Sequence, residues 1–264
     1  MRQQKQRRQL MLLMMIFVCV IGLILAILSM STTTKKTSDS YYDLDAFGYK
    51  NGLMTFNDSN YSTQTGIDVS SHQGSIDWDA VKTSDISFAM IRCGYRGASE
   101  GALYEDSAFV SNIKAAKAAG LKVGVYWFSS AITVSEAKEE ADYVLSLISD
   151  YDLDMPVAFD MERLEGQSSR IDNLTKSEKT KIANAFISRL KKKGYQTLVY
   201  GNTSWLSNDI QVKKIKSDIW LASYSDTLKY KKAFTMWQYT QKGSVDGISE
   251  SVDIDLYIQK KVNI

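Results

Sequence analysis

The sequence predicts an α/β protein: a modified TIM-type barrel, (β/α)5(β)3, with an N-terminal transmembrane helix. Three observations lead to this fold class. Residues 10–28 carry no charged group, eight short apolar stretches follow from Gly66 onward, and helical patterns fill only the earlier gaps between those stretches. Alternating strands and helices are typical of a parallel sheet, and eight strands can close into a barrel. The alternative is an open doubly wound sheet, which usually carries a glycine-rich phosphate loop after its first strand; residues 66–75 do not form one.

The N-terminus is predicted to be a membrane anchor. Residues 1–9 form a basic cytoplasmic head and residues 10–30 a transmembrane helix, whose uncharged part would be about 28 Å long, close to the roughly 30 Å of bilayer hydrocarbon. A cleaved signal peptide is the alternative, but its apolar region is usually shorter and ends in small residues, for which only residues 29–31 are available. The prediction is a single-pass protein of the cell membrane, with a cytoplasmic N-terminus and the domain that follows the anchor outside the cell.

Residues 31–65 are predicted to be a polar tether. They are rich in Ser, Thr, Asn, Asp, Lys and Tyr and show no sustained period. The alternative is that the tyrosines and residues 51–56 (NGLMTF) pack on the domain as an N-terminal extension. The barrel domain itself is placed at residues 66–264.

The charge distribution does not favour a nucleic-acid partner. The composition, 44% apolar and 23% charged, suits one globular core with an appendage. Residues 1–36 hold six of the 32 basic residues and none of the 30 acidic ones, so the remainder carries a net charge of −4. Nucleic-acid binding would need a clustered basic face, which the sequence does not show.

Eight strands are expected after the tether. Helical patterns in the first gaps include residues 106–119, which end at Gly120, and two capping boxes, Thr133–Glu136 and Thr175–Glu178, which open the next two helices. After the fifth strand only one short helix is expected, within residues 203–217. The strands are expected at residues 66–70, 87–95, 122–130, 156–163, 196–202, 218–224, 234–240 and 252–258.

Acidic residues stand near the ends of three of these strands. Residues two apart on a strand point to the same side, so Asp160 and Glu162 are expected to face the barrel mouth together. Active sites of such barrels form at the carboxyl ends of the strands. Asp68 lies on the first strand and Asp253 on the last, and these two strands become neighbours when the barrel closes. Four acids could therefore meet at one mouth.

A close carboxylate pair is typical of glycosidic bond cleavage. Each acid alone could instead cap a helix or lie in solvent, but two close carboxylates repel, and burial raises the pKa of at least one. The result is a proton donor beside an anion, the combination that splitting a glycosidic bond requires.

Other chemistries fit less well. His72 is the only histidine, which removes histidine-rich metal sites and most histidine-activated nucleophiles, and we interpret it as a hydrogen-bonding loop residue. Cys19 and Cys93 suggest no disulfide. No cofactor and no metal are predicted, although a carboxylate-only magnesium or calcium site stays open. Among the aromatic residues at the strand ends, Tyr126, Tyr200 and Trp237 are expected to line the mouth and bind substrate.

Residues 66–258 resemble glycoside hydrolase family 25, the lysozyme or muramidase family. The similarity rests on GIDVSSHQGSIDW, FAMIRCGYRG, GLKVGVYWF, the D-x-E of AFDMER, and WQYT followed by VDIDLYI. The resemblance implies a flattened barrel of five helices and eight strands. It also implies hydrolysis of the β-1,4 bond between N-acetylmuramic acid and N-acetylglucosamine in peptidoglycan glycan strands.

The resemblance also implies roles for the four acids. Glu162 corresponds to the general acid, and Asp160 to a residue that stabilises an intermediate, with Asp68 and Asp253 completing the set. One departure is visible, because Asp255 stands where the family motif V-D-x-N commonly has Asn. Retaining, inverting and substrate-assisted mechanisms stay open, and we favour the last.

Two functions of different classes remain after this comparison. The first is a membrane-anchored muramidase that remodels the wall of its own cell. The second is a catalytically inactive scaffold that binds wall glycan, although a binding module has no need of a repelling carboxylate pair. A chitin-like substrate is disfavoured, because the positions two and five before Asp160 are Ala158 and Met155 rather than acids.

Overall fold

The computed structural model describes residues 41–164, 166–224 and 228–261. The predicted head and anchor, residues 1–30, and the first part of the predicted tether, residues 31–40, lie outside these ranges. Within them, no helix combines the length and the apolar character needed to cross a bilayer.

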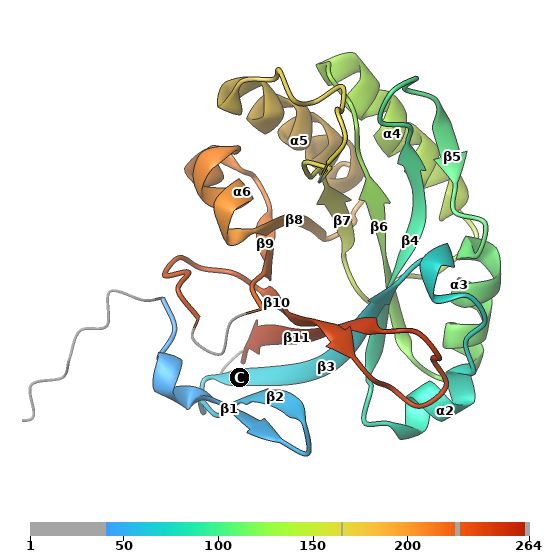
Figure 1. Cartoon of the computed structure of the whole chain (residues 1–264), viewed down its shortest axis with the longest axis vertical. Helices are drawn as coiled ribbons and strands as arrows, with labels where there is room; N and C mark the ends of the chain where they lie inside the picture. The colour runs from blue at the N-terminus through green and yellow to red at the C-terminus, as the bar shows by residue number, and fades with distance from the viewer. Residues whose placement is uncertain (1–40, 165, 225–227, 262–264) are drawn as a thin grey trace, which may run out of the picture. The chain divides into compact units, whose positions relative to one another are not determined.

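Eight strands form a closed barrel (Figure 1), as the sequence predicts. The first strand, β3, pairs with both β4 and β11, and this double pairing closes the sheet. All neighbours run parallel except β11, which is antiparallel to β10 and to β3. In order around the barrel the strands are β3 (Tyr61–Val69), β4 (Phe88–Arg96), β6 (Lys122–Phe128), β7 (Val157–Asp160), β8 (Thr197–Asn202), β9 (Asp218–Ala222), β10 (Met236–Gly243) and β11 (Val252–Lys260).

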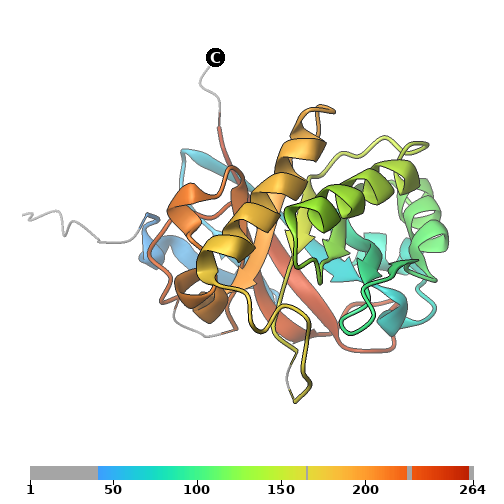
Figure 2. The ribbon, with the colours of Figure 1, turned by 90° about the horizontal axis from the view of Figure 1, so that it is seen from above.

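A helix follows each of the first five barrel strands. A short strand, β5 (Leu103–Glu105), also pairs with the outer end of β4, and short 3-10 turns occupy Leu44–Ala46, Ser71–Gln73 and Val212–Lys214. Figure 2 shows α4 and α5 lying against one another on the outside of the barrel. The helices are α2 (Trp78–Thr83), α3 (Phe109–Ala118), α4 (Val134–Leu147), α5 (Lys176–Lys191) and α6 (Thr203–Asn208).

The helix ends follow the local signals of the sequence. Thr175 and Glu178 form the reciprocal capping box at the start of α5, whereas at α4 only the Thr133 half forms, because the Glu136 carboxylate accepts from the backbone N–H of Ile132 instead. Gly120 follows α3 with a φ of 77°, a left-handed conformation that glycine adopts without strain.

Residues 41–65 are not a tether in this structure, which differs here from the prediction. After the first 3-10 turn, β1 (Phe47–Lys50) and β2 (Leu53–Phe56) form a hairpin, and residues 61–65 already belong to β3. Asn51 and Gly52 both have positive φ, as a tight hairpin turn requires. The segment packs because its aromatic rings find an apolar partner: Tyr42 is buried and its hydroxyl donates to the carbonyl of Phe234. The alternative of an N-terminal extension is the one that this packing supports.

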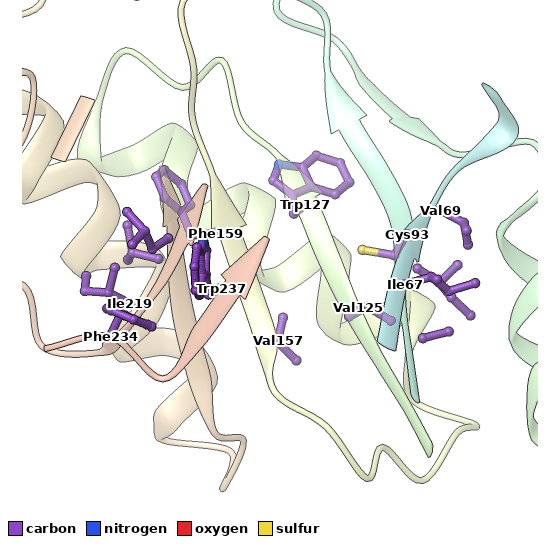
Figure 3. Close-up of a cluster of buried hydrophobic side chains, with 14 of the residues drawn as sticks. Ile67, Val69, Cys93, Val125, Trp127, Val157, Phe159, Ile219, Phe234 and Trp237 are labelled. Atoms are coloured by element: carbon purple, nitrogen blue, oxygen red, sulfur yellow. The ribbon is translucent and has the colours of Figure 1, made fainter. Parts of the chain in front are cut away.

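Two layers of apolar side chains determine where polar side chains can gather inside the barrel. The outer layer lies between strands and helices, and ten of its members are labelled in Figure 3, among them Trp127, Phe159 and Trp237. The inner layer fills the barrel below its mouth and consists of Phe88, Met90, Met155, Ala158, Leu198, Tyr200, Trp220, Ala222, Met236 and Tyr257. Polar side chains that point inward are therefore collected above this plug, at one end of the barrel.

Candidate active site

A cavity of about 180 Å³ lies at the barrel mouth. It contains all four predicted acids and two of the three predicted aromatic residues, Tyr126 and Tyr200. The cavity is lined by Asp68, Arg92, Tyr126, Phe128, Asp160, Glu162, Tyr200, Trp220, Gln238 and Asp253.

Asp253 reaches this mouth because of the direction of its strand. Asp253 lies near the beginning of β11 and is the direct backbone partner of Asp68, which lies near the end of β3. Since β11 runs antiparallel to its neighbours, its first residues lie where the other strands end. The pairing brings two carboxylates from opposite ends of the domain sequence into one layer, and burial raises the pKa of Asp253 to about 6.

Asp160 and Glu162 form a second acidic pair. Asp160 is the last residue of β7, is buried, and has one carboxylate oxygen, Oδ1, without a hydrogen-bond partner. Burial, and then the charge of Glu162, raise the pKa of Asp160 well above its usual range. Burial also raises the pKa of Glu162 to about 7. The pair therefore shares a proton near neutral pH.

Gln238 organises the other side of the cavity, although the sequence analysis did not single it out. Its Nε2 donates to Oδ2 of Asp68 at 2.6 Å. Its Oε1 accepts from the hydroxyls of Tyr200 at 2.9 Å and Tyr224 at 2.6 Å. The available signal was a polar residue inside the otherwise apolar start of β10, next to Trp237. Gln238 thus holds Asp68 and two tyrosines in fixed orientations.

Trp237 does not line the mouth, contrary to the prediction. It belongs to the outer layer, is 2% exposed, and its Nε1 donates to the carbonyl of Ser223 at 2.9 Å (Figure 3). Alternate residues of a strand point to opposite faces, and on β10 it is Gln238 that points inward. Trp220 of β9 supplies the indole at the mouth instead, with its ring edge toward Tyr200 at 5.0 Å between centroids.

A wider groove adjoins the cavity and shares Arg92 and Phe128 with it. The groove has a volume of about 500 Å³ and is also lined by His72. Arg92 is held there by Asp106, whose Oδ2 accepts from its Nε at 2.7 Å. Among the described residues, no group of three or more His, Cys, Asp or Glu side chains is arranged to hold a metal ion.

The loop that carries Glu162 is fastened to two helices by ion pairs. Arg163 donates from Nε and Nη2 to Oδ1 of Asp209 at 3.1 and 2.6 Å. The same oxygen accepts from Nζ of Lys179 on α5 at 2.7 Å, and Lys179 is 1% exposed. This network ties the residue after Glu162 to the body of the domain.

We expect Arg163→Ala to lower activity several-fold through loosened placement of Glu162. Arg163 is 55% exposed, so its loss should change the free energy of unfolding by less than about 1 kcal/mol. The measurement compares wild type and Arg163→Ala in peptidoglycan turnover and in the free energy of unfolding from chemical denaturation. The matched control is Arg189→Ala, which breaks a solvent-exposed pair with Asp142 away from the site and should leave turnover unchanged. Equal turnover in both variants would contradict the positioning role.

The chain is similar to known cell-wall lysozymes over most of its described length. The profile of Glycosyl hydrolases family 25 matches residues 67–248. The autolytic lysozyme of Clostridium acetobutylicum is 33% identical over 191 residues, which are 72% of this chain and 54% of that protein.

Solved structures share the fold. The modular autolysin LytC of Streptococcus pneumoniae, solved in complex with a synthetic peptidoglycan ligand, superposes with a TM-score of 0.67 at 25% identity, over 80% of this chain and 52% of that one. The bacterial lysozyme of Streptomyces coelicolor gives a TM-score of 0.61 at 27% identity, over 74% of this chain and 92% of that one. The chain thus spans about half the length of the clostridial and pneumococcal proteins, and nearly all of the Streptomyces lysozyme.

Proposed function

The chain belongs to glycosyl hydrolases family 25, and on that premise we propose that it cleaves the β-1,4 bond between N-acetylmuramic acid and N-acetylglucosamine in peptidoglycan. The observation that carries the proposal is the buried pair of Asp160 and Glu162 at the mouth of the closed barrel. One carboxyl holds a proton near neutral pH while its neighbour is an anion, as glycoside hydrolysis requires.

We assign a role to each acid of this pair from the resemblance to the family, which the raised pKa values support. Glu162, with a pKa raised to about 7, is the general acid that protonates the leaving glycosidic oxygen. When Glu162 gives up its proton, positive charge develops at the sugar carbon, and Asp160 lies beside it as the stabilising carboxylate. In the substrate-assisted route that we favour, Asp160 orients the N-acetyl group of the muramic acid and stabilises the oxazolinium ion.

The remaining groups bind and orient the sugar. Tyr126, Tyr200 and Trp220 form an aromatic side of the cavity. Asp68 and Asp253 add negative potential, which favours a cationic transition state. Gln238 keeps Asp68 in place without adding charge.

We further propose that the enzyme is anchored in the cell membrane and remodels the wall of the cell that makes it. The support is the uncharged stretch at residues 10–28 behind a basic head. Membrane fractionation followed by protease treatment of intact spheroplasts tests this. The full-length chain should sediment with membranes and lose its barrel to external protease; a shortened soluble product would indicate a cleaved signal peptide instead.

The full-length chain, purified in a non-ionic detergent, tests the reaction on purified peptidoglycan. Mass spectrometry of the new reducing ends should identify muramic acid. Glucosamine ends would contradict the proposed bond. Sedimentation with intact sacculi without any new reducing ends would support the inactive glycan-binding scaffold.

The pH dependence of kcat/KM follows from the protonation of Glu162. Because the acid must be protonated to donate, activity should fall above about pH 7, approaching tenfold per pH unit. Initial rates of muropeptide release from about pH 5 to about pH 9, with the fold checked at each pH, provide the measurement. Activity that stayed constant to the alkaline end would exclude Glu162 as the proton donor.

A further inference from the structure

Asp255 is a buried acid that the proposed reaction does not use. It lies on β11 with 0% of its surface exposed. Its backbone partners are Gly66 on β3 and Gln238 on β10. Because Asp255 follows Asp253 by two residues on β11, its side chain points to the same face, one layer below the paired Asp68 and Asp253.

The hydrogen bonds of Asp255 account for only one of its oxygens. Oδ1 accepts from Nε1 of Trp220 at 2.7 Å. Oδ2 is buried and meets no donor. The carboxyl of Asp255 interacts with that of Asp68, which lies one layer above it on the neighbouring strand β3 and whose Oδ2 accepts from Gln238. Two carboxyl oxygens in contact attract each other only when a proton lies between them.

No cation compensates for the second charge. The titratable groups that interact electrostatically with Asp255 are Asp68 on β3, Asp253 on its own strand and Tyr239, which lies in the outer layer on β10. Within the described ranges, no salt bridge reaches Asp68, Asp253 or Asp255. Burial raises the pKa of both Asp68 and Asp255 well above the usual range. Two adjacent buried anions without a cation would be strongly unfavourable.

We propose that Asp255 is a positioning residue that shares one proton with Asp68 in a hydrogen bond between the two carboxyls, so that the two acids carry a single negative charge. Asp255 thereby joins two side chains: its Oδ1 accepts from Trp220, and its carboxyl is hydrogen-bonded to that of Asp68. Asp68 is held between Gln238 and Asp255. The mouth gains no additional charge beside Asp253 and Glu162.

The first test is thermodynamic and does not depend on activity. A carboxyl pair that holds a proton when folded and loses it when unfolded makes stability fall as pH rises, from the unfolded pKa near 4 up to the folded pKa of the pair. Asp255→Asn removes that proton. Relative to wild type, the folding equilibrium constant of this variant should therefore rise by about tenfold per pH unit above roughly pH 5, up to the folded pKa of the pair.

Guanidinium unfolding of the full-length chain in detergent measures this difference. Asp246→Asn is the matched control, because Asp246 is exposed in a loop and should show no pH-dependent difference from wild type. A difference between Asp255→Asn and wild type that does not change with pH would overturn the shared proton.

The second test concerns position and rests on the proposed hydrolase function. Asp255→Ala removes the hydrogen-bond partner of the Asp68 carboxyl and the acceptor for Trp220, so peptidoglycan turnover at about pH 6 should fall at least tenfold. Asp255→Asn should restore most of that loss. A folded Asn variant as inactive as the Ala variant would overturn the positioning role. Absence of turnover in wild type, with the stability slope present, would instead reject only the proposed function.

Discussion

Replacing Glu162 with glutamine is expected to lower peptidoglycan hydrolysis by about a thousandfold while the barrel stays folded. Glutamine has nearly the same shape but no proton to give at the leaving oxygen. The burial that raises the pKa of Glu162 to about 7 stabilises the neutral form, so a neutral amide should be tolerated at the same place. The measurement is muramic acid reducing ends per unit time, beside far-UV circular dichroism and a denaturation curve.

Glu250→Gln is the matched control for that substitution. Glu250 is exposed in the loop between β10 and β11, so the same chemical change there should leave turnover within about twofold of wild type. If Glu162→Gln kept more than a tenth of wild-type turnover, the proton donor would have to be another group. Binding of the folded Glu162→Gln variant to sacculi should persist, because the aromatic side of the cavity is intact.

Replacing Trp237 with alanine is expected to lower the free energy of unfolding by about 3–5 kcal/mol. The ring is 2% exposed and packs in the outer layer, with the rings of Phe47 at 5.2 Å and Phe234 at 6.3 Å between centroids. Its removal leaves a cavity between the barrel and the N-terminal hairpin. Guanidinium denaturation of the full-length chain measures the loss.

Kinetics separate this structural role from substrate binding. At a temperature where Trp237→Ala is fully folded, its KM for soluble glycan fragments should equal that of wild type, since the side chain lies away from the cavity. Trp237→Phe keeps a ring and loses mainly the hydrogen bond to Ser223, so it should cost only about 1 kcal/mol. A raised KM with unchanged stability would instead show that Trp237 binds substrate at the barrel mouth, as the sequence predicted.

Local patterns were sufficient to predict most of the fold. All eight barrel strands were predicted from short apolar runs, and the helix starts at Thr133 and Thr175 from the spacing of a hydroxyl and a carboxylate. These signals act within a few residues, so they are readable without tertiary context. The hairpin at residues 47–56 was predicted as tether, because its stability comes from aromatic contacts with β10 rather than from its own composition.

The chemical composition of the site was also visible in the sequence. Asp68, Asp160, Glu162 and Asp253 were predicted to meet because three strand ends were predicted to converge, and they line one cavity. Their catalytic roles stay predictions. Tyr126 and Tyr200 line the same cavity, whereas Trp237 does not. Gln238 is a single polar residue among apolar ones on β10. It shows which set of alternating residues faces into the barrel, but this can be read only once the pairing register of the strand is known.

The sequence by itself determined the number and order of the strands and which acids stand at their ends, because these depend on residue types a few positions apart. Only the tertiary structure decided how the last strand runs, which indole lines the mouth, and what lies against Asp255. Those outcomes depend on pairing between strands, such as that of β3 with β11, which lie far apart in the chain. A one-residue change in register exchanges the inward and outward faces of a strand, and a reversal of its direction exchanges its two ends. Neither change alters the local sequence pattern.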